Sequence, residues 1–261
     1  MHGLSGTDGD RAIDWGRTSA DYARFRAGPP DSFFAKLAAL DIGLPGQRIL
    51  DLGTGTGVLA RRFAKQGATS AGVDIAAEQI AAARRLAEEE GVAVDFRIAP
   101  AEATGFPDAR FDVVTANQCW LYFDAPRAIA EAHRVAPGGL LMVGHFSWLP
   151  RLDAIARASE ALVLHFNPQW SGADWSGEVP PQPRWAEGLR LVGFFVYDVA
   201  IPFTREIWRG RIRACRGIGA GMSADEVAAF DAAHQALLEE IAPPAFTVRH
   251  RIDAHVFALD F

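Results

Sequence analysis

Three glycines separated by single residues follow an acid in the segment from Ile49 to Gly57. The apolar start of this segment predicts a buried parallel strand, and residues 58–65 carry apolar and basic side chains at helical spacing. Because glycine lacks a Cβ atom, it can adopt positive φ and lets the backbone approach a ligand closely. We therefore predict a turn that holds a nucleoside-containing ligand, with an ordinary strand-to-helix turn as the alternative.

A second acid supports ligand binding. Asp74 ends a short apolar run about twenty residues after the glycines, where βαβ nucleotide sites place the carboxylate that accepts hydrogen bonds from ribose hydroxyls. Sites for nicotinamide dinucleotides and for S-adenosylmethionine share this arrangement. The dinucleotide fingerprint Gly-x-Gly-x-x-Gly requires a glycine where this chain has Val58, so a diphosphate-binding turn is less well supported.

Further motifs follow in a fixed order. They are Ala101-Glu102, Phe106-Pro107-Asp108, Phe111-Asp112-Val113-Val114 and Arg134-Val135-Ala136-Pro137-Gly138-Gly139. Together with the glycine turn and Val73-Asp74, they resemble the class I S-adenosylmethionine-dependent methyltransferases, most closely the small-molecule group that includes the ubiquinone and menaquinone biosynthesis enzymes. The resemblance covers roughly residues 22–145. It implies that S-adenosylmethionine is the cofactor and S-adenosylhomocysteine the product.

The resemblance also assigns roles to individual residues. The glycines would line the methionine and ribose portions of the cofactor, Asp74 would bind the ribose, and Asp51 would face the aminoacyl end. Glu102 would sit against the adenine, although it could be a solvated loop acid, and Asn117 would approach the amino group, although it could cap the backbone. The expected cofactor contacts are Tyr22, Asp51, Gly53, Thr54, Gly55, Gly57, Asp74, Ile75, Ala101, Glu102, Asn117 and Gln118.

His145 is the preferred candidate for a catalytic residue. It falls at the carboxyl end of the predicted fifth strand, where a general base could remove a proton from a hydroxyl or a protonated amine. A structural histidine is the alternative. Aromatic side chains nearby could form an apolar wall or stack on a flat substrate, although core packing is nearly as well supported. The aromatic candidates for substrate binding are Trp120, Tyr122, Trp170 and Trp175.

A stripe of arginines marks a helix predicted over Thr204 to Arg216. Arg205, Arg209, Arg213 and Arg216 recur every three to four residues, whereas Trp208, Ile212 and Cys215 mark the opposite face. Such a stripe is usually a solvated charged face. Guanidinium groups also suit carboxylates, so Arg209 and Arg213 are candidates for binding an anionic substrate.

Bulk properties exclude several classes of function. A net charge of −6 and a pI near 5.6 argue against binding a nucleic-acid backbone. No uncharged apolar run reaches the length of a membrane span. The two cysteines suit a reduced cytoplasm, no histidine spacing indicates a bound metal, and residues 1–10 are typical of a loose terminus rather than a signal peptide. A monomer and a homodimer both remain open.

Regular alternation of strands and helices predicts an α/β fold, a doubly wound and mostly parallel sheet; the resemblance implies seven strands. The expected strands are Arg48 to Leu52, Ser70 to Asp74, Val92 to Ile98, Phe111 to Ala116, Leu140 to Phe146, Val192 to Pro202 and Phe246 to Leu259. We expect one domain, in which a helical cap (1–46), a cofactor-binding core (47–147), a substrate lid (148–190) and closing elements (191–261) follow one another. The loop 167–184 is long enough to be a lid.

The sequence therefore predicts transfer of a methyl group to an O, N or C atom of a small molecule. A nicotinamide-dependent oxidoreductase on the same type of sheet is one alternative. A protein that binds S-adenosylmethionine without turnover is the other, because no catalytic side chain is obligatory in this chemistry.

Overall fold

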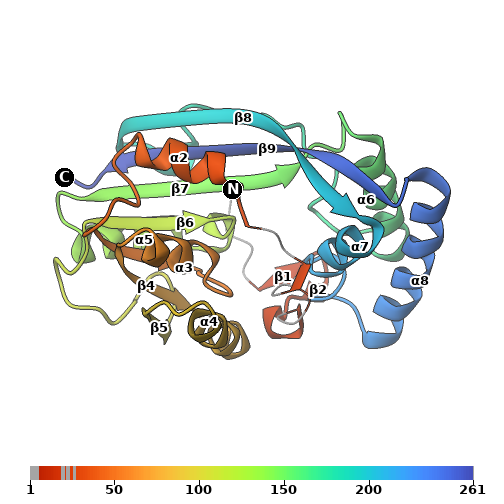
Figure 1. Cartoon of the computed structure of the whole chain (residues 1–261), viewed down its shortest axis with the longest axis horizontal. Coiled ribbons are helices and arrows are strands. Elements are labelled where there is room, and N and C mark those ends of the chain that lie inside the picture. Colours follow the sequence, from red (N-terminus) through yellow and green to blue (C-terminus); the bar gives the residue numbers. More distant parts are fainter. Residues whose placement is uncertain (1–5, 19–20, 22–23, 26–27, 261) are drawn as a thin grey trace.

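The computed structural model describes residues 6–18, 21, 24–25 and 28–260. Seven strands form one sheet in the order β5-β4-β3-β6-β7-β9-β8 (Figure 1). The strands β3 (Arg48–Leu52), β4 (Thr69–Asp74), β5 (Val94–Ile98), β6 (Val113–Asn117) and β7 (Leu140–Trp148) are parallel. Two antiparallel strands, β9 (Ala245–Ala258) and β8 (Arg190–Thr204), complete the sheet beyond β7. This arrangement confirms the predicted fold class.

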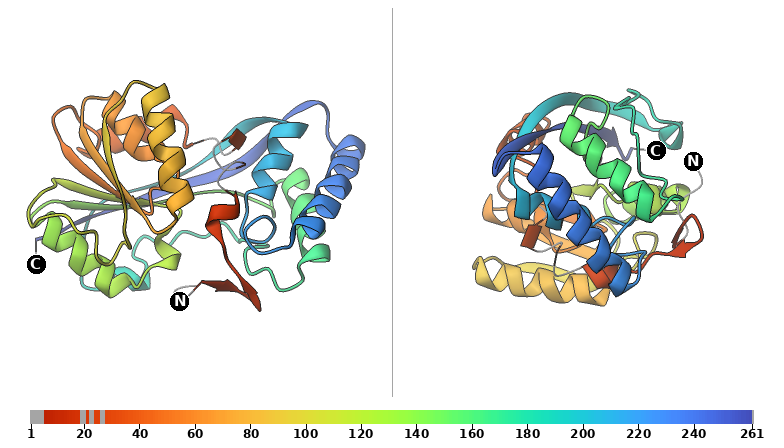
Figure 2. Two further views of the ribbon diagram at one scale, coloured as in Figure 1. Left: turned by 90° about the horizontal axis from the view of Figure 1, so that it is seen from below. Right: turned by 90° about the vertical axis from the view of Figure 1, so that its right-hand side faces the viewer.

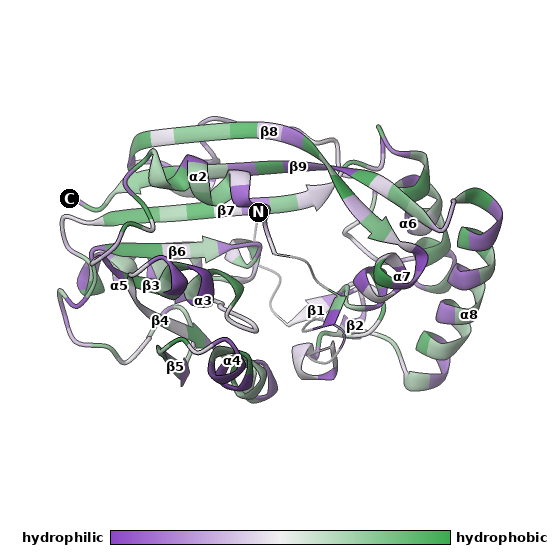
Figure 3. Ribbon diagram, in the orientation of Figure 1, coloured by the Kyte–Doolittle hydropathy of each residue, from purple (hydrophilic) through white to green (hydrophobic). Residues whose placement is uncertain are grey.

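Side-chain alternation along the central strands creates two apolar layers. Ile49 and Val113 belong to a cluster with α2 (Asp31–Ala38) and α3 (Val58–Lys65) on one face. Their neighbours Leu50 and Val114 pack instead with α5 (Ala125–Val135) on the other face. A third cluster holds α4 (Ala77–Glu89) against β5. Hydrophobic residues accordingly predominate along β6, β7 and β8 in Figure 3.

A group of three helices lies beyond the carboxyl ends of the parallel strands. It is called the cap below and is distinct from the predicted amino-terminal cap. It consists of α6 (Ala154–Phe166), α7 (Arg205–Arg213) and α8 (Ala224–Ile241), which Figure 2 shows grouped past the sheet, with α4 and α5 on opposite faces of it. The strands β8 and β9 are 15 and 14 residues long and continue into this cap. Trp148, Trp208 and Phe230 extend the apolar cluster of α2 and α3 into the cap.

The amino-terminal segment differs from the predicted loose terminus. Within its described residues, β1 (Thr7–Asp8) and β2 (Arg11–Ala12) form an antiparallel hairpin, followed by the 3-10 helix η1 (Trp15–Thr18). The Asp8 side chain is buried, and its carboxylate accepts hydrogen bonds from Ser171, after α6, and from Arg216, after α7. Part of the predicted helical cap (1–46) lies outside the described residues.

Two histidines are enclosed in the cap and its junction with the sheet. His234 and His250 are fully buried, and His250 lies among the rings of Phe146, Phe203 and Trp208. Burial disfavours the charged imidazole and lowers the pKa of each histidine from 6.5 to about 4.

These buried histidines predict that acid destabilises the fold. An unfolded chain would bind protons near pH 6.5, so the free energy of unfolding should fall as the pH is lowered from 6.5 to 4, by on the order of 3 kcal/mol per histidine. Urea unfolding at several pH values measures this. His250→Gln should reduce the slope with pH, whereas the variant His165→Gln, at an exposed position, should not. Equal slopes in all three proteins would contradict the assignment.

Candidate active site

A cavity of about 540 Å³ opens at the carboxyl edge of the parallel strands. Its walls come from the β3–α3 turn, the ends of β4, β5 and β6, the strand β7, and residues of the cap. Open α/β sheets bind ligands at this edge, and the volume lies in the range of small-molecule sites.

The β3–α3 turn reaches the cavity through Gly53 and Gly55, both at positive φ. A Cβ atom on Gly53 would lie 2.8 Å from Cys119 Cβ, so only glycine fits there. The Gly55 amide donates to Asp74 Oδ2 over 2.9 Å, and the Ala76 amide donates to Asp74 Oδ1 over 2.9 Å. Burial raises the pKa of Asp74, which also lines the cavity. The turn and the end of β4 are therefore joined through one carboxylate.

Gly57, a predicted cofactor contact, does not line the cavity. It precedes α3 with φ of +77°, and a Cβ atom there would lie 2.5 Å from Phe96 Cζ. The close approach of α3 to β5 by itself requires a glycine at this position.

Asp51 and Thr54 lie just behind the cavity wall. The Asp51 carboxylate is buried and accepts hydrogen bonds from the hydroxyls of Thr54 and Thr115, each over 2.7 Å. Burial raises its pKa to about 6. Both residues line a smaller hollow of about 40 Å³, which shares Gly53 and Asn117 with the main cavity.

Asn117, the last residue of β6, and Gln118 after it both line the cavity. Gln118 adopts a φ of +64° and donates its amide to the Gly144 carbonyl. The side-chain Oδ1 of Asn117 is buried and has no hydrogen-bond partner among the described residues. A buried acceptor without a donor costs about 1–3 kcal/mol, so a ligand donor would stabilise this position.

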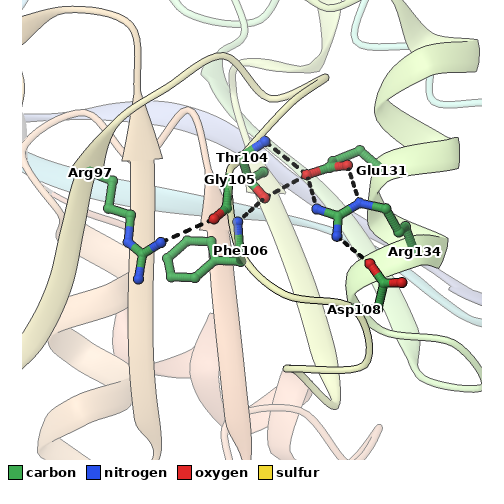
Figure 4. A network of polar contacts seen from close by, with 7 residues as sticks. All are labelled: Arg97, Thr104, Gly105, Phe106, Asp108, Glu131 and Arg134. Atoms are coloured by element: carbon green, nitrogen blue, oxygen red, sulfur yellow. Dashed lines mark hydrogen bonds and ion pairs between the residues drawn. The ribbon is translucent and has the colours of Figure 1, made fainter.

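The cavity wall beyond β5 contains Ala101 and Glu102, with Ile75 from the end of β4 exposed at the rim. The Asp124 amide donates to Glu102 Oε1 over 2.8 Å. A polar network fixes the chain that follows (Figure 4): Glu131 of α5 accepts hydrogen bonds from the Thr104 amide and hydroxyl and pairs with Arg134.

The substrate side of the cavity brings together residues from distant parts of the chain. His145, Tyr122, Trp170 and Trp175 all line it, and the rings of His145 and Trp175 meet edge to face with centroids 4.7 Å apart. Trp120 differs from its prediction as a substrate contact. It is buried in the α5 cluster and packs on Trp185 with centroids 4.6 Å apart.

The arginine stripe also differs from its prediction. Arg209 and Arg213 pair with Asp231 of α8, and Arg213 binds Asp21 as well; neither arginine lines the cavity. Arg211 and Arg216 line the cavity instead. Arg216 donates to Asp8 over 2.9 Å and to the Tyr122 hydroxyl and Ser171 Oγ over 3.1 Å.

Comparisons with known proteins agree with this geometry. The methyltransferase domain family matches residues 50–143. A demethylmenaquinone methyltransferase from Thermus thermophilus is 44% identical over 43% of this chain and 54% of its own length. A ubiquinone biosynthesis O-methyltransferase from Xylella fastidiosa is 31% identical over 66% of this chain and 70% of its own length. The chain belongs to the S-adenosylmethionine-dependent methyltransferases.

A solved structure agrees with this methyltransferase in fold. The phosphoethanolamine N-methyltransferase 2 of Haemonchus contortus is 20% identical, with a TM-score of 0.54 over 91% of this chain and 56% of that chain. Several curated relatives are matched over only about half of their length. The family assignment disfavours the nicotinamide-dependent oxidoreductase that the glycine turn also allowed.

Several cavity residues of the methyltransferase were absent from the predicted site. They include Trp15, Cys119, Ser147, Trp148, Ser171, Arg211 and Cys215. No sequence motif indicated that η1 would contribute Trp15 to the cavity wall. The predicted contact Tyr22 lies outside the described residues. In the part of the chain that the structure describes, no three His, Cys, Asp or Glu side chains are grouped to hold a metal ion. No helix there is long and apolar enough to cross a bilayer.

A pair of glycine variants tests the packing role of Gly57. Gly57→Ala and Gly91→Ala both place a Cβ at positive φ, at a cost of about 1–3 kcal/mol, but only the first meets a neighbouring ring, Phe96, because the space around Gly91 is open. Thermal unfolding should show a larger loss of stability for Gly57→Ala. Equal losses would contradict a packing role for Gly57.

Proposed function

We propose that this protein transfers the methyl group of S-adenosylmethionine to an O, N or C atom of a small molecule. The observation that carries the proposal is the shape of one continuous cavity. One end is formed by the glycine turn, Asp74 and the unpartnered acceptor of Asn117, and the other end by aromatic rings and His145.

The residues at the first end fit the cofactor in chemical type. The Asn117 Oδ1 acceptor suits the ammonium group of the methionine portion, with the Asp51 carboxylate just behind it. Asp74 carries the carboxylate expected to accept hydrogen bonds from a ribose diol. Ile75, Ala99 and Leu121 offer apolar surface for the adenine. Gly53 and Gly55 leave room for the sulfonium and ribose.

Bound S-adenosylmethionine supplies an electrophilic methyl group, so the chain itself mainly has to align an acceptor and exclude water. Trp170, Trp175 and Tyr122 provide flat apolar walls for this purpose. His145 is the proposed catalytic residue, because its ring faces the cavity and could take a proton from the acceptor.

The proposed partners of the protein follow from its net charge. A net charge of −6 disfavours a nucleic acid as the acceptor. We infer a small-molecule acceptor, a cytoplasmic location and a monomer or homodimer. The quinone-related acceptors named for the relatives belong to those enzymes, which this chain matches only in part.

Calorimetry tests cofactor choice. S-adenosylhomocysteine should bind and NADH should not, because the turn lacks the third glycine of a dinucleotide site. Asp74→Asn should weaken S-adenosylhomocysteine binding about tenfold or more, since hydrogen bonds to a charged group contribute about 1.5–3 kcal/mol. Asp95→Asn, on the neighbouring strand and outside the cavity, is the matched control. Tighter binding of NADH would contradict the proposal.

Turnover is tested with cofactor labelled in the methyl group. Incubation with a bacterial metabolite extract should yield a labelled small molecule, and Asp74→Asn should reduce its amount at limiting cofactor. If S-adenosylhomocysteine binds but no labelled product forms, the protein is a cofactor-binding protein without turnover.

A further inference from the structure

A row of polar side chains runs along β9, beside the cavity residues of β7. Arg251, Asp253 and His255 alternate along β9 and therefore share one face. The antiparallel register places His145 opposite Asp253 and Ser147 opposite Arg251 on the adjacent strand β7. The residues between them, such as Phe146, Ile252 and Ala254, point to the other face and belong to the apolar core.

Asp253 stands in the middle of this row, and its side chain is 7% exposed. Its Oδ1 lies 3.7 Å from His145 Nδ1, and its Oδ2 lies 3.7 Å from His255 Nδ1. A buried carboxylate is costly unless charged or polar groups compensate it. The other charged groups nearby are Arg251 and its partner Asp198 on β8, which form an ion pair with Nε 2.6 Å from Oδ1.

The two histidines beside Asp253 differ in what holds them. His255 Nε2 lies 2.9 Å from the Pro180 carbonyl, which can only accept, so this nitrogen carries the proton. In a neutral ring, His255 Nδ1 then has no proton to offer Asp253. His145 has its Nδ1 toward Asp253 and its ring at the cavity wall against Trp175. Of the two histidines, His145 is therefore the one whose neutral ring can carry a proton on the nitrogen that faces Asp253.

We propose that Asp253 is a positioning residue that keeps His145 in the Nδ1-protonated form, leaving Nε2 to accept a proton from a substrate hydroxyl in the cavity. This inference rests on the proposed function and commits its acceptor to a hydroxyl. The 3.7 Å separation is longer than a hydrogen bond, and such contacts often shorten when the substrate is bound.

The reaction balances with these groups. The acceptor oxygen forms a bond to the methyl carbon and loses its proton to His145 Nε2. The electron pair of the broken carbon–sulfur bond stays on sulfur, which becomes a neutral thioether. The resulting imidazolium faces the Asp253 carboxylate through Nδ1 and later releases its proton to water. A neutral amine or a thiolate would not need such a base, so the arrangement favours an acceptor that must lose a proton, and the proposal commits to a hydroxyl rather than a protonated amine.

The test is nuclear magnetic resonance of the histidine rings in the full chain with S-adenosylhomocysteine added. His145→Gln identifies the His145 signals. Their nitrogen shifts should show the Nδ1-protonated form, and Asp253→Asn should increase the share of the Nε2-protonated form, because the carboxylate beside Nδ1 favours a proton on that nitrogen. Asp198→Asn, on the same sheet, is the matched control and should leave the ratio of the two forms unchanged.

An Nε2-protonated His145 in the native protein would overturn the proposal, as would an unchanged ratio of the two protonated forms in Asp253→Asn. If Asp253→Asn does not fold, the form of His145 in the native protein still decides. Failure of S-adenosylhomocysteine to bind the native chain would contradict the proposed function itself. The carbon shift of a ¹³C-methyl product then identifies the acceptor atom, and a methyl group on nitrogen or carbon would overturn the assignment of a hydroxyl.

Discussion

The hydrogen bond from the Gly55 amide to the Asp74 carboxylate is the contact on which the cofactor end of the cavity depends. It joins the turn after β3 to the end of β4, two adjacent parallel strands. The Gly55 amide can reach the carboxylate because the turn bends at positive φ. The buried Asp51 beneath the turn, held by two threonine hydroxyls, supports the same geometry from the interior of the sheet.

The cap depends on contacts of a different kind. Its apolar core is continuous with that of the sheet, whereas ion pairs connect it to the amino-terminal hairpin. Arg216 binds Asp8, and Arg11 binds Glu226 of α8 through both guanidinium nitrogens. The amino-terminal segment thus closes one side of the cavity, with Trp15 in its wall and the Trp15 carbonyl within hydrogen-bond distance of Gln79. Residues of the loop 167–184, among them Trp170 and Trp175, line the same cavity.

The strands and the cofactor end could be predicted from sequence because both arise from local patterns. Apolar runs identify buried parallel strands, and the glycines and Asp74 lie in one βαβ unit. The substrate end arises from pairing across the whole chain. The periodicity of the arginine stripe can be read from the sequence. Only the fold shows that Arg209 forms an ion pair with Asp231 and that Arg213 forms one with Asp21. Likewise, Asp8 and Arg216 are too far apart in sequence for any local pattern to connect them.

The most direct measurement is a crystal structure of the protein with S-adenosylhomocysteine. The account predicts that the ribose hydroxyls bind Asp74 and that the ligand ammonium donates to Asn117 Oδ1, which lacks a donor among the described residues. The adenine should lie between Ile75 and Leu121. A complex in which Asn117 Oδ1 stays unpartnered while the adenosyl group binds away from Asp74 would contradict it.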